Sequence, residues 1–472
     1  MNNRSDFSLT RNAINYSWRQ LALRAGIEDF RQQDADSQYF GVPLYYGFPE
    51  QIPYKGKKVV VIPCKDRDWA ELVRRPAESI DWILPQAAFP DAAHLPFDYS
   101  IPVIFWGDSS QKGKIAECAS DGTLIFHVDL LATAFFMLSR WEEMDRTLCD
   151  EHGRFPAPAS VAYKHGFLDV PIVDLYGLLL REWFKVIAPG WRPTPAHFRI
   201  NLTHDIDWIR HFSNFSQFAR VAGSALLKQK KVGAFLKQFQ NLYVQITAPA
   251  QDDYVRSIYH LADQSEAHGF SSRFYVMAAE ANAYQQGYDP ATPWLQECLE
   301  NLRQRGHEIG IHPGYYTLGN PEQLIVEKQQ LEKVLGENIS GGRQHYLRFQ
   351  APSTWRHWEE AGLLYDSSMG YAEHEGFRAG TCHPYRPFDI ESDREMLIEE
   401  IPLIVMDTSL RYYRRFSGEE AKRKMLTLAQ RCADVDGVFT MLWHNTSFSG
   451  DWMEWGLMYP DVLNALSAMA NP

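Results

Sequence analysis

The feature that most constrains the fold is an alternation of strand-like and helix-like segments in the C-terminal part of the chain. Apolar, β-branched runs predict strands at 198–203, 272–277, 308–312, 346–349, 399–406 and 438–443. Amphipathic spacing predicts helices at 293–305, 321–335, 353–361 and 418–434, and Gly306 and Gly336 stop the first two. Alternating strands and helices indicate βαβ units. We therefore predict a parallel α/β sheet or barrel over residues 198–472.

The first 188 residues show a different, mixed α/β pattern. Strands are expected at 58–63 and 101–106, and helices at 129–143, with Asp129 as N-cap, and at 171–187. The segment 189–197 holds three prolines in nine residues, a density that interrupts regular structure. We predict a smaller mixed α/β domain of unknown role over 1–188 and a linker over 189–197.

Composition excludes several classes of protein. A formal net charge of −12 over 472 residues argues against a nucleic-acid binder. The six cysteines show no C-x-x-C spacing, which fits a reducing compartment. The N-terminus lacks the apolar region of a secretory signal, and the longest apolar run, 130–138, is too short to span a bilayer. We expect a soluble cytoplasmic protein.

Asp205 and Asp207 follow the first strand of the C-terminal part. If the strand continues through them, their side chains lie on one face, because side chains alternate along a strand. Two carboxylates on one face repel unless a cation lies between them or one takes a proton. The pair therefore predicts a metal site, an acid/base site or both, and the alternative is a polar strand end that leads into a loop.

Three further polar residues fall at or near the ends of other strands: His312, Arg348 and His444. Parallel α/β folds gather catalytic groups at the carboxyl ends of their strands. Asp and His are ordinary ligands of a divalent ion, a free carboxylate can act as a base, and a histidine can act as an acid. An arginine beside the base keeps it ionised. The set fits metal-assisted hydrolysis.

The motifs that carry these residues resemble those of the polysaccharide deacetylase (NodB-homology) family. They are 203–207 (THDID), 306–312 (GHEIGIH), 348–352 (RFQAP), 362–371 (GLLYDSSMGY) and 442–444 (LWH). The resemblance covers about 198–446 and implies a distorted (β/α) barrel that removes an acyl group from a sugar with a divalent metal, expected to be Zn²⁺. It implies Asp205 as the base with Arg348 as its partner, Asp207 and His312 as metal ligands, and His444 as the general acid.

The sequence departs from that family at two places. Ile206 separates the two aspartates, which are commonly adjacent in the family. The family's second metal histidine lies four residues after the first, and Tyr316 stands there. Tyrosine is a poor ligand at neutral pH. Either another group such as His204 completes the site, or the ion binds more weakly through waters, or the site is inactive.

Substrate contacts are expected from Tyr316, from Trp443 and from the glycine-rich loop 376–384. In that loop Arg378 either meets an acidic sugar or belongs to a hydrogen-bonded structural loop, and nothing marks Cys382 as an activated thiol. The segments 140–143 and 150–156 mix charged and aromatic residues. They either line a sugar-binding groove or, as we favour, form a helix end and loop held by ion pairs.

Residues 208–251 interrupt the strand–helix rhythm. They carry six basic residues and no Asp or Glu, and their apolar residues have helical spacing. This stretch is either a solvated helical insertion, which we favour, or a lid or foot that contacts an anionic membrane surface.

We therefore predict a metal-dependent carbohydrate deacetylase that acts on an acylated amino sugar of a glycan or glycan precursor in cell-envelope metabolism. The alternatives are a glycan-binding module that has lost catalysis, which Tyr316 motivates, and a hydrolase of another non-peptide C–N bond. The chain shows no Walker loop and no G-x-S-x-G motif.

Overall fold

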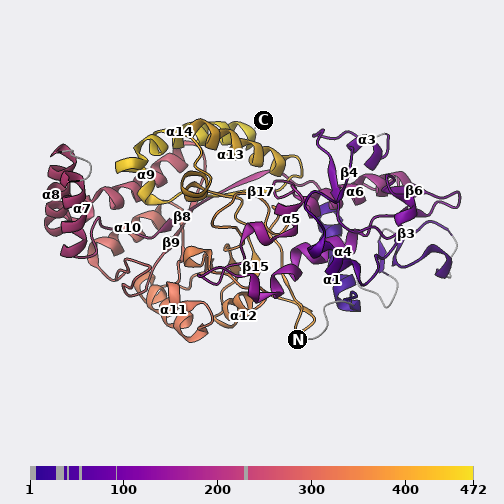
Figure 1. Cartoon of the computed structure of the whole chain (residues 1–472), viewed down its shortest axis with the longest axis horizontal. Coiled ribbons are helices and arrows are strands. Elements are labelled where there is room, and N and C mark those ends of the chain that lie inside the picture. The colour runs from indigo at the N-terminus through magenta and orange to yellow at the C-terminus, as the bar shows by residue number, and fades with distance from the viewer. Residues whose placement is uncertain are drawn as a thin grey trace.

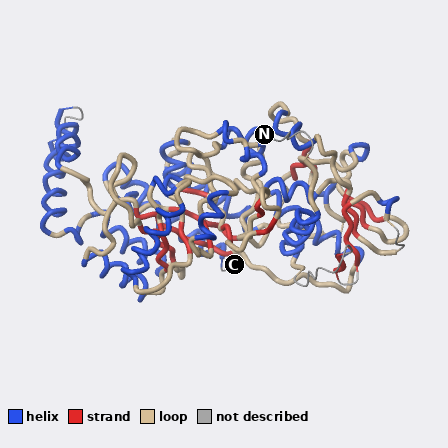
Figure 2. Tube along the Cα trace, turned by 90° about the horizontal axis from the view of Figure 1, so that it is seen from below, coloured by secondary structure: helices blue, strands red, loops and turns tan. Residues whose placement is uncertain are grey.

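The computed structural model describes residues 7–27, 37–39, 42–52, 56–91, 93–227 and 232–470. The molecule is elongated, with an N-terminal part at one end and a C-terminal part that begins at β8 (Figure 1). A tube view from below shows strands gathered in two separate places, one in each part (Figure 2).

The C-terminal part is built on an eight-stranded sheet in the order β15-β12-β11-β10-β9-β8-β17-β16. Every neighbouring pair in it is parallel, which confirms the predicted parallel α/β arrangement. The strands are β8 (Arg199–Ile206), β9 (Ser272–Val276), β10 (Glu308–Ile311), β11 (Gly341–Gly342), β12 (Tyr365–Asp366), β15 (Glu399–Glu400), β16 (Val405–Met406) and β17 (Val438–Leu442). The helices between and after them are α9 (Asp253–Ala267), α10 (Pro293–Gln304), α11 (Pro321–Leu335), α12 (Ser353–Glu360), α13 (Gly418–Ala433) and α14 (Met453–Ala470).

This sheet curls strongly. The rings of Tyr275 on β9 and Tyr365 on β12 lie 6.5 Å apart although the strands are three positions apart. In a flat sheet that separation is about 14 Å, at about 4.8 Å per strand. Curling brings the carboxyl ends of distant strands around one opening.

Two predicted strands differ from the structure. Residues 346–349 are not a strand, since a 3-10 turn covers His345–Leu347 and the strand beside β10 is β11, five residues earlier. The run 399–406 is divided into β15 and β16, which lie at opposite edges of the sheet. The two strands are too short for hydrophobic periodicity to separate them.

The N-terminal part contains a mixed five-stranded sheet in the order β1-β2-β3-β7-β6. Its strands are β1 (Ser37–Tyr39), β2 (Val42–Tyr46), β3 (Val59–Val61), β6 (Ala116–Cys118) and β7 (Leu124–Phe126), and β4 (Asp81–Ile83) pairs with β5 (Ile101–Val103). The helices are α1 (Arg11–Ala25), α2 (Asp68–Arg74), α3 (Pro85–Ala88), α4 (Leu130–Leu138), α5 (Val161–Lys164) and α6 (Ile172–Ile187).

The predicted helix at 129–143 is shorter in the structure. Asp129 caps α4 as expected, because its carboxylate accepts a hydrogen bond from the Ala132 amide at 2.9 Å. The helix stops before Arg140, whose φ of 54° is left-handed. A 3-10 turn over Trp141–Met144 follows. This early stop turns Arg140 and Glu143 into the interior, where both are buried.

The two parts share one large apolar core cluster. It contains residues of α1, α4 and α6 together with residues of the curled sheet and its helices. Trp191, inside the predicted linker, is also buried in it. The division at 189–197 stays a prediction.

Two helices, α7 (Phe215–Leu227) and α8 (Val232–Thr247), occupy most of the 208–251 stretch. They pack on each other as a hairpin that projects at the end of the molecule opposite the N-terminal part (Figure 1). The predicted basic residues Lys228, Lys230 and Lys231 lie outside the described residues. Across the described chain, every helix is too short or too polar to cross a bilayer.

Candidate metal centre

Three side chains from three strand ends converge at the carboxyl edge of the curled sheet. Asp207 follows β8, His312 follows β10, and His345 follows β11. One carboxylate oxygen of Asp207 lies 3.0 Å from Nε2 of His312 and 3.2 Å from Nδ1 of His345. The two ring nitrogens lie 3.0 Å apart. The predicted ligands Asp207 and His312 are thus brought together, and His345 joins them.

Hydrogen bonds on the far side of each ring decide which nitrogens are free. Nδ1 of His312 lies 2.7 Å from the carbonyl oxygen of Arg343, and Nε2 of His345 lies 3.3 Å from that of Tyr284. A carbonyl oxygen only accepts, so each of these nitrogens donates a proton. The nitrogens that face Asp207 therefore present lone pairs when the rings are neutral.

The donor set fits a divalent cation. The facing oxygen of Asp207 is buried and accepts no hydrogen bond from the protein, an arrangement that is costly without a partner. Burial alone would raise the pKa of this carboxyl, but His345 and His312 hold it well below its usual range. Two imidazole nitrogens and one carboxylate oxygen match a catalytic zinc site that keeps one position open.

Asp205 lies beside this group and is held by a different arginine from the one predicted. Its carboxylate accepts a hydrogen bond of 2.9 Å from the guanidinium of Arg343, and both side chains are buried. Arg348, the predicted partner, instead donates to the carbonyl oxygens of His152 and Tyr315 and stacks over the Tyr315 ring. The prediction of Arg348 as the partner of Asp205 is therefore wrong, because the strand end was placed too late in the chain.

His444 faces the metal group from β17, on the other side of β8. Its Nε2 lies 3.7 Å from the second oxygen of Asp207, and its Nδ1 donates to Asp407 at 2.7 Å. Burial would lower the pKa of His444, but Asp407 outweighs it and raises this pKa to about 9. Asp407 itself is fixed by hydrogen bonds from the His444 amide and the Ser447 hydroxyl. The imidazole is thus held protonated at neutral pH.

His345 was not predicted because the strand was placed at 346–349, and no element was assigned to Gly341 and Gly342. Glycine is required in β11, because a Cβ on Gly341 would lie 2.4 Å from the Tyr365 carbonyl oxygen and one on Gly342 would lie 1.8 Å from that of Ile311. A glycine pair between two predicted helices can mark a strand squeezed by its neighbours. That signal places Arg343 and His345 at the strand end. Asp407 had no comparable signal.

The centre opens into a cavity of about 300 Å³. Beside Asp205, Asp207, His312, His345 and His444, its walls carry five aromatic side chains: Trp208, Tyr284, Tyr346, Tyr412 and Tyr413. The N-terminal part contributes Arg154, which pairs with Asp150 at 2.8 Å and donates to the Tyr346 carbonyl oxygen. The segment 150–156 is therefore an ion-paired loop, as favoured, and also a cavity wall.

Three other predicted roles fail on burial or bonding. Arg378 is buried and forms two hydrogen bonds to Glu143, at 2.8 and 2.7 Å, so it does not meet substrate. Trp443 is completely buried against Tyr459. His204 is bonded to the Trp443 carbonyl oxygen and to Ser272, away from the ion group, and burial lowers its pKa to about 3.

Tyr316 does not lie among the residues that form the cavity wall. Its side chain is 57% exposed and contacts the rings of Tyr284 and Tyr315. A substrate contact through Tyr316 stays a prediction. The third ligand-type side chain beside Asp207 and His312 is His345 and not Tyr316.

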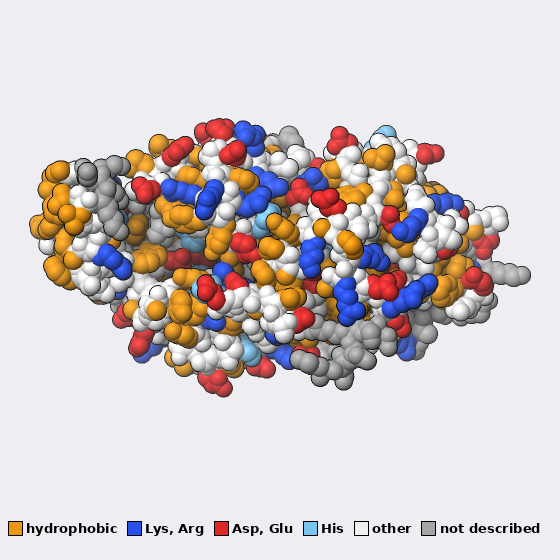
Figure 3. Space-filling model, viewed as in Figure 1, with side chains coloured by type: hydrophobic (Ala, Val, Ile, Leu, Met, Phe, Trp, Pro, Cys, Tyr) orange, Lys and Arg blue, Asp and Glu red, His pale blue; other side chains and the backbone are white. Residues whose placement is uncertain are grey.

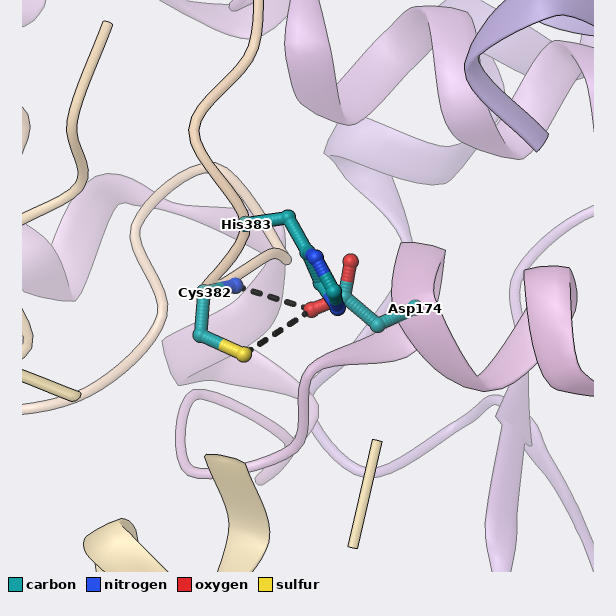
Figure 4. A group of neighbouring side chains, drawn as sticks. All are labelled: Asp174, Cys382 and His383. Carbon is teal, nitrogen blue, oxygen red and sulfur yellow. Dashed lines mark hydrogen bonds between the residues drawn. The ribbon is translucent and has the colours of Figure 1, made fainter. Parts of the chain in front are cut away.

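A second group of potential ligands, Asp174, Cys382 and His383, lies between the two parts (Figure 4). Here the carboxylate is already fully bonded. It pairs with the buried Arg24 at 2.7 Å and accepts from the Thr381 hydroxyl and from the amide and thiol of Cys382. Burial raises the pKa of the Cys382 thiol well above its ordinary value. A cation would have to displace an arginine and a thiol proton, so these residues do not fit one.

Comparisons with known proteins find one family match over part of the chain and several solved structures of low sequence identity. Residues 73–189 match a family of unknown function, DUF7033. A search of curated proteins found no match. Among solved structures, the chain is similar to an assigned polysaccharide deacetylase from Mycobacterium smegmatis, at 16% identity and a TM-score of 0.37, over 59% of this chain and 87% of that one.

Two further solved structures resemble the chain to a similar degree. An assigned polysaccharide deacetylase from Pseudomonas aeruginosa PAO1 is 14% identical with a TM-score of 0.36, over 58% of this chain and 86% of that one. The Puue allantoinase is 13% identical with a TM-score of 0.36, over 59% and 93%. Likeness at this level fixes neither the fold nor the activity of this chain.

Proposed function

We propose that the protein is a metal-dependent hydrolase that removes an acetyl or other acyl group from an amino sugar, on a distorted (β/α) barrel of the polysaccharide deacetylase type. One observation carries the proposal. The Asp207, His312 and His345 group lies between an arginine-held carboxylate, Asp205, and an aspartate-held histidine, His444. Ion site, base and acid therefore share one opening.

Each residue has a distinct chemical task. Asp207, His312 and His345 would hold the ion, which supplies an acidified water and polarises the acyl carbonyl. Asp205 accepts the proton of the attacking water, and Arg343 orients that carboxylate through a hydrogen bond of 2.9 Å. His444 donates a proton from Nε2 to the leaving nitrogen. Asp407, which accepts a hydrogen bond from Nδ1, raises the pKa of the imidazole so that Nε2 carries that proton.

The walls of the cavity support a carbohydrate substrate. Five aromatic side chains and one guanidinium surround the ion group, and sugar rings pack their C–H faces on aromatic rings. With two nitrogen ligands and one oxygen ligand, Zn²⁺ is the expected ion. We also propose a cell-envelope glycan precursor as substrate and a cytoplasmic location, on the sequence alone.

The alternative of a glycan-binding module without catalysis is less well supported. It rested on Tyr316 standing where a ligand was expected, and His345, at a neighbouring strand end, lies where it would supply that ligand. Hydrolysis of a different non-peptide C–N bond uses the same groups, and it is separated from deacetylation by the choice of substrate.

The test measures acetate release by zinc-loaded protein from N-acetylated sugar oligomers. We expect turnover that Asp205→Asn lowers by about 10²–10⁴-fold while zinc content is unchanged. Arg348→Met is the matched control, because Arg348 makes no bond to Asp205 and donates instead to the His152 carbonyl oxygen. Retained turnover in Asp205→Asn would exclude Asp205 as the base. Turnover only on amides that lack a sugar would replace the proposed substrate class.

A further inference from the structure

The α7–α8 hairpin has two faces. One faces the metal centre, and the other is exposed to solvent in the described part of the chain. Phe218 and Ala222 of α7 pack with Phe235 and Leu242 of α8 in a small cluster separate from the main core. The hairpin is thus stabilised by its own apolar seam. Its outer face is left without a partner in the described chain.

The outer face of α8 is a continuous apolar stripe. Its residues recur at intervals of four, three, four and three, which places them on one side of a helix. They are between 48% and 71% exposed: Val232, Leu236, Phe239, Tyr243 and Ile246. Phe215 and Leu227 at the two ends of α7 are 72% and 78% exposed. Figure 3 shows hydrophobic side chains gathered over this end of the molecule.

The charge of the same segment is opposite to that of the rest of the chain. Residues 208–251 carry six basic residues and no acidic one, whereas the whole protein has a net charge of −12. Arg220 lies on α7 and is exposed. Lys237 lies on the inward side of α8, where it lines the cavity beside Asp207 and is 3.7 Å from a carboxylate oxygen of Asp253. An apolar stripe on a segment whose sequence carries six basic and no acidic residues is complementary to an anionic lipid surface, which offers both acyl chains and phosphate charge. A protein partner would have to supply a matching apolar groove with acidic rims.

We propose that the outer face of the α7–α8 hairpin docks this protein on the surface of an anionic phospholipid bilayer. The stripe of α8 enters the headgroup region, and the basic charge of the segment attracts the anionic lipid surface. Docking is peripheral and weakens at high salt, because its electrostatic part is screened.

The inward side of the hairpin faces the metal centre. Gln217, Val221 and Asn241 of the hairpin and Asp207 and His444 of the centre line one cavity of about 530 Å³. In the docked state the hairpin lies between the metal centre and the bilayer. The opening of the centre is then separated from the bilayer by one layer of helix, which is about 10 Å thick. Combined with the proposed function, this position favours a lipid-linked acyl sugar as the substrate. The substrate inference rests on the proposed function, whereas the docking inference does not.

Flotation of the full-length protein with vesicles tests the docking. We expect binding to vesicles with about 30% phosphatidylglycerol, little binding to pure phosphatidylcholine, and release at about 0.5 M salt. The triple variant Leu236→Ser, Tyr243→Ser, Ile246→Ser should lower binding by about tenfold or more. Its unfolding temperature should match that of wild type, because the three side chains are exposed.

The control is the double variant Leu364→Ser, Leu397→Ser. These residues are 66% and 71% exposed just before β12 and β15, outside the hairpin, and should leave vesicle binding unchanged. Equal binding by wild type and the triple variant, or no wild-type binding, would overturn the proposal. Light scattering tests whether a second copy of the chain covers this face instead. If the wild type is a dimer that binds no vesicles and the triple variant is a monomer, the face is a dimer interface. These outcomes do not depend on turnover.

Discussion

The molecule contains two groups of side chains that look alike in composition and differ in what their atoms already bind. Asp207, His312 and His345 meet at the carboxyl edge of the curled sheet, and Asp174, Cys382 and His383 meet between the two parts. In the first group the facing oxygen of Asp207 accepts no hydrogen bond. In the second group both oxygens of Asp174 are occupied, one of them by Arg24. Proximity of ligand-type residues therefore does not define a metal site, whereas unoccupied lone pairs do.

The difference also separates function from stability. The Asp174–Arg24 pair joins α6 to α1 and carries the loop at 381–382. Nearby, Glu143 pairs with Arg378 and Arg140, which joins the segment after α4 to the C-terminal part. These buried pairs hold the two parts together, whereas the group at Asp207 is arranged for a ligand.

The largest expected effect is loss of the ion from the first group only. His345→Ala removes one of three ligands, so zinc affinity should fall by about 100-fold or more and turnover with it. His383→Ala is the matched change in the second group and should leave zinc content at the wild-type level. Metal analysis after dialysis against zinc measures both. Equal losses in the two variants would remove the distinction between the groups.

The second prediction concerns stability and has the opposite pattern. Asp174→Ala leaves the guanidinium of Arg24 buried without its partner, so the free energy of unfolding should drop by about 3–5 kcal/mol. Asp207→Ala, measured without metal, should lower it by less, because His312 and His345 can lose their charge once Asp207 is gone, whereas the guanidinium of Arg24 cannot. Urea unfolding of the two variants, both metal-free, gives the comparison. A larger loss in Asp207→Ala would contradict it.

A third prediction concerns the pH dependence of turnover. Burial lowers the pKa of His444 and Asp407 raises it, to about 9. An acid must be protonated, so activity should decline as pH rises through that pKa. Asp407→Asn removes the raising charge, and the alkaline limb of kcat/KM should move to lower pH. An unmoved limb would show that His444 is not the proton donor.

The smallest expected effect is at Tyr316. Tyr316→Phe removes only an exposed hydroxyl, so zinc content and kcat/KM should stay within about twofold of wild type. Tyr315→Phe is the comparison, because the Tyr315 hydroxyl is bonded to His152 at 2.8 Å. Loss of zinc in Tyr316→Phe would return this residue to the ligand set.

Sequence periodicity predicted the long elements well and the short ones poorly. The helices at α10 and α11 and the strands at β8, β9 and β17 have enough residues for their apolar spacing to be decisive. β11 has two residues, both glycine, so it carries no side-chain pattern. The helix α1 has a polar composition and was not predicted, although Trp18 and Leu21 bury it against α4 and α6.

The same limit explains which site residues were predicted. Asp205 lies within β8, and Asp207, His312 and His444 follow strands of four or more residues. The structure gathers all four around one cavity. Arg343 and His345 follow β11, and Asp407 follows β16, which also has two residues. Arg378 and Trp443 looked suitable by residue type, but their burial depends on contacts distant in sequence, such as that between Arg378 and Glu143.

X-ray absorption at the zinc edge of the zinc-loaded protein tests the central claim most directly. A zinc ion in the first group has only nitrogen and oxygen ligands, at about 2.0–2.2 Å, with the outer-shell scattering of two imidazole rings. A zinc ion in the second group has a sulfur ligand at about 2.3 Å from Cys382. We predict a spectrum with two imidazoles and no sulfur, and a sulfur shell would contradict the account.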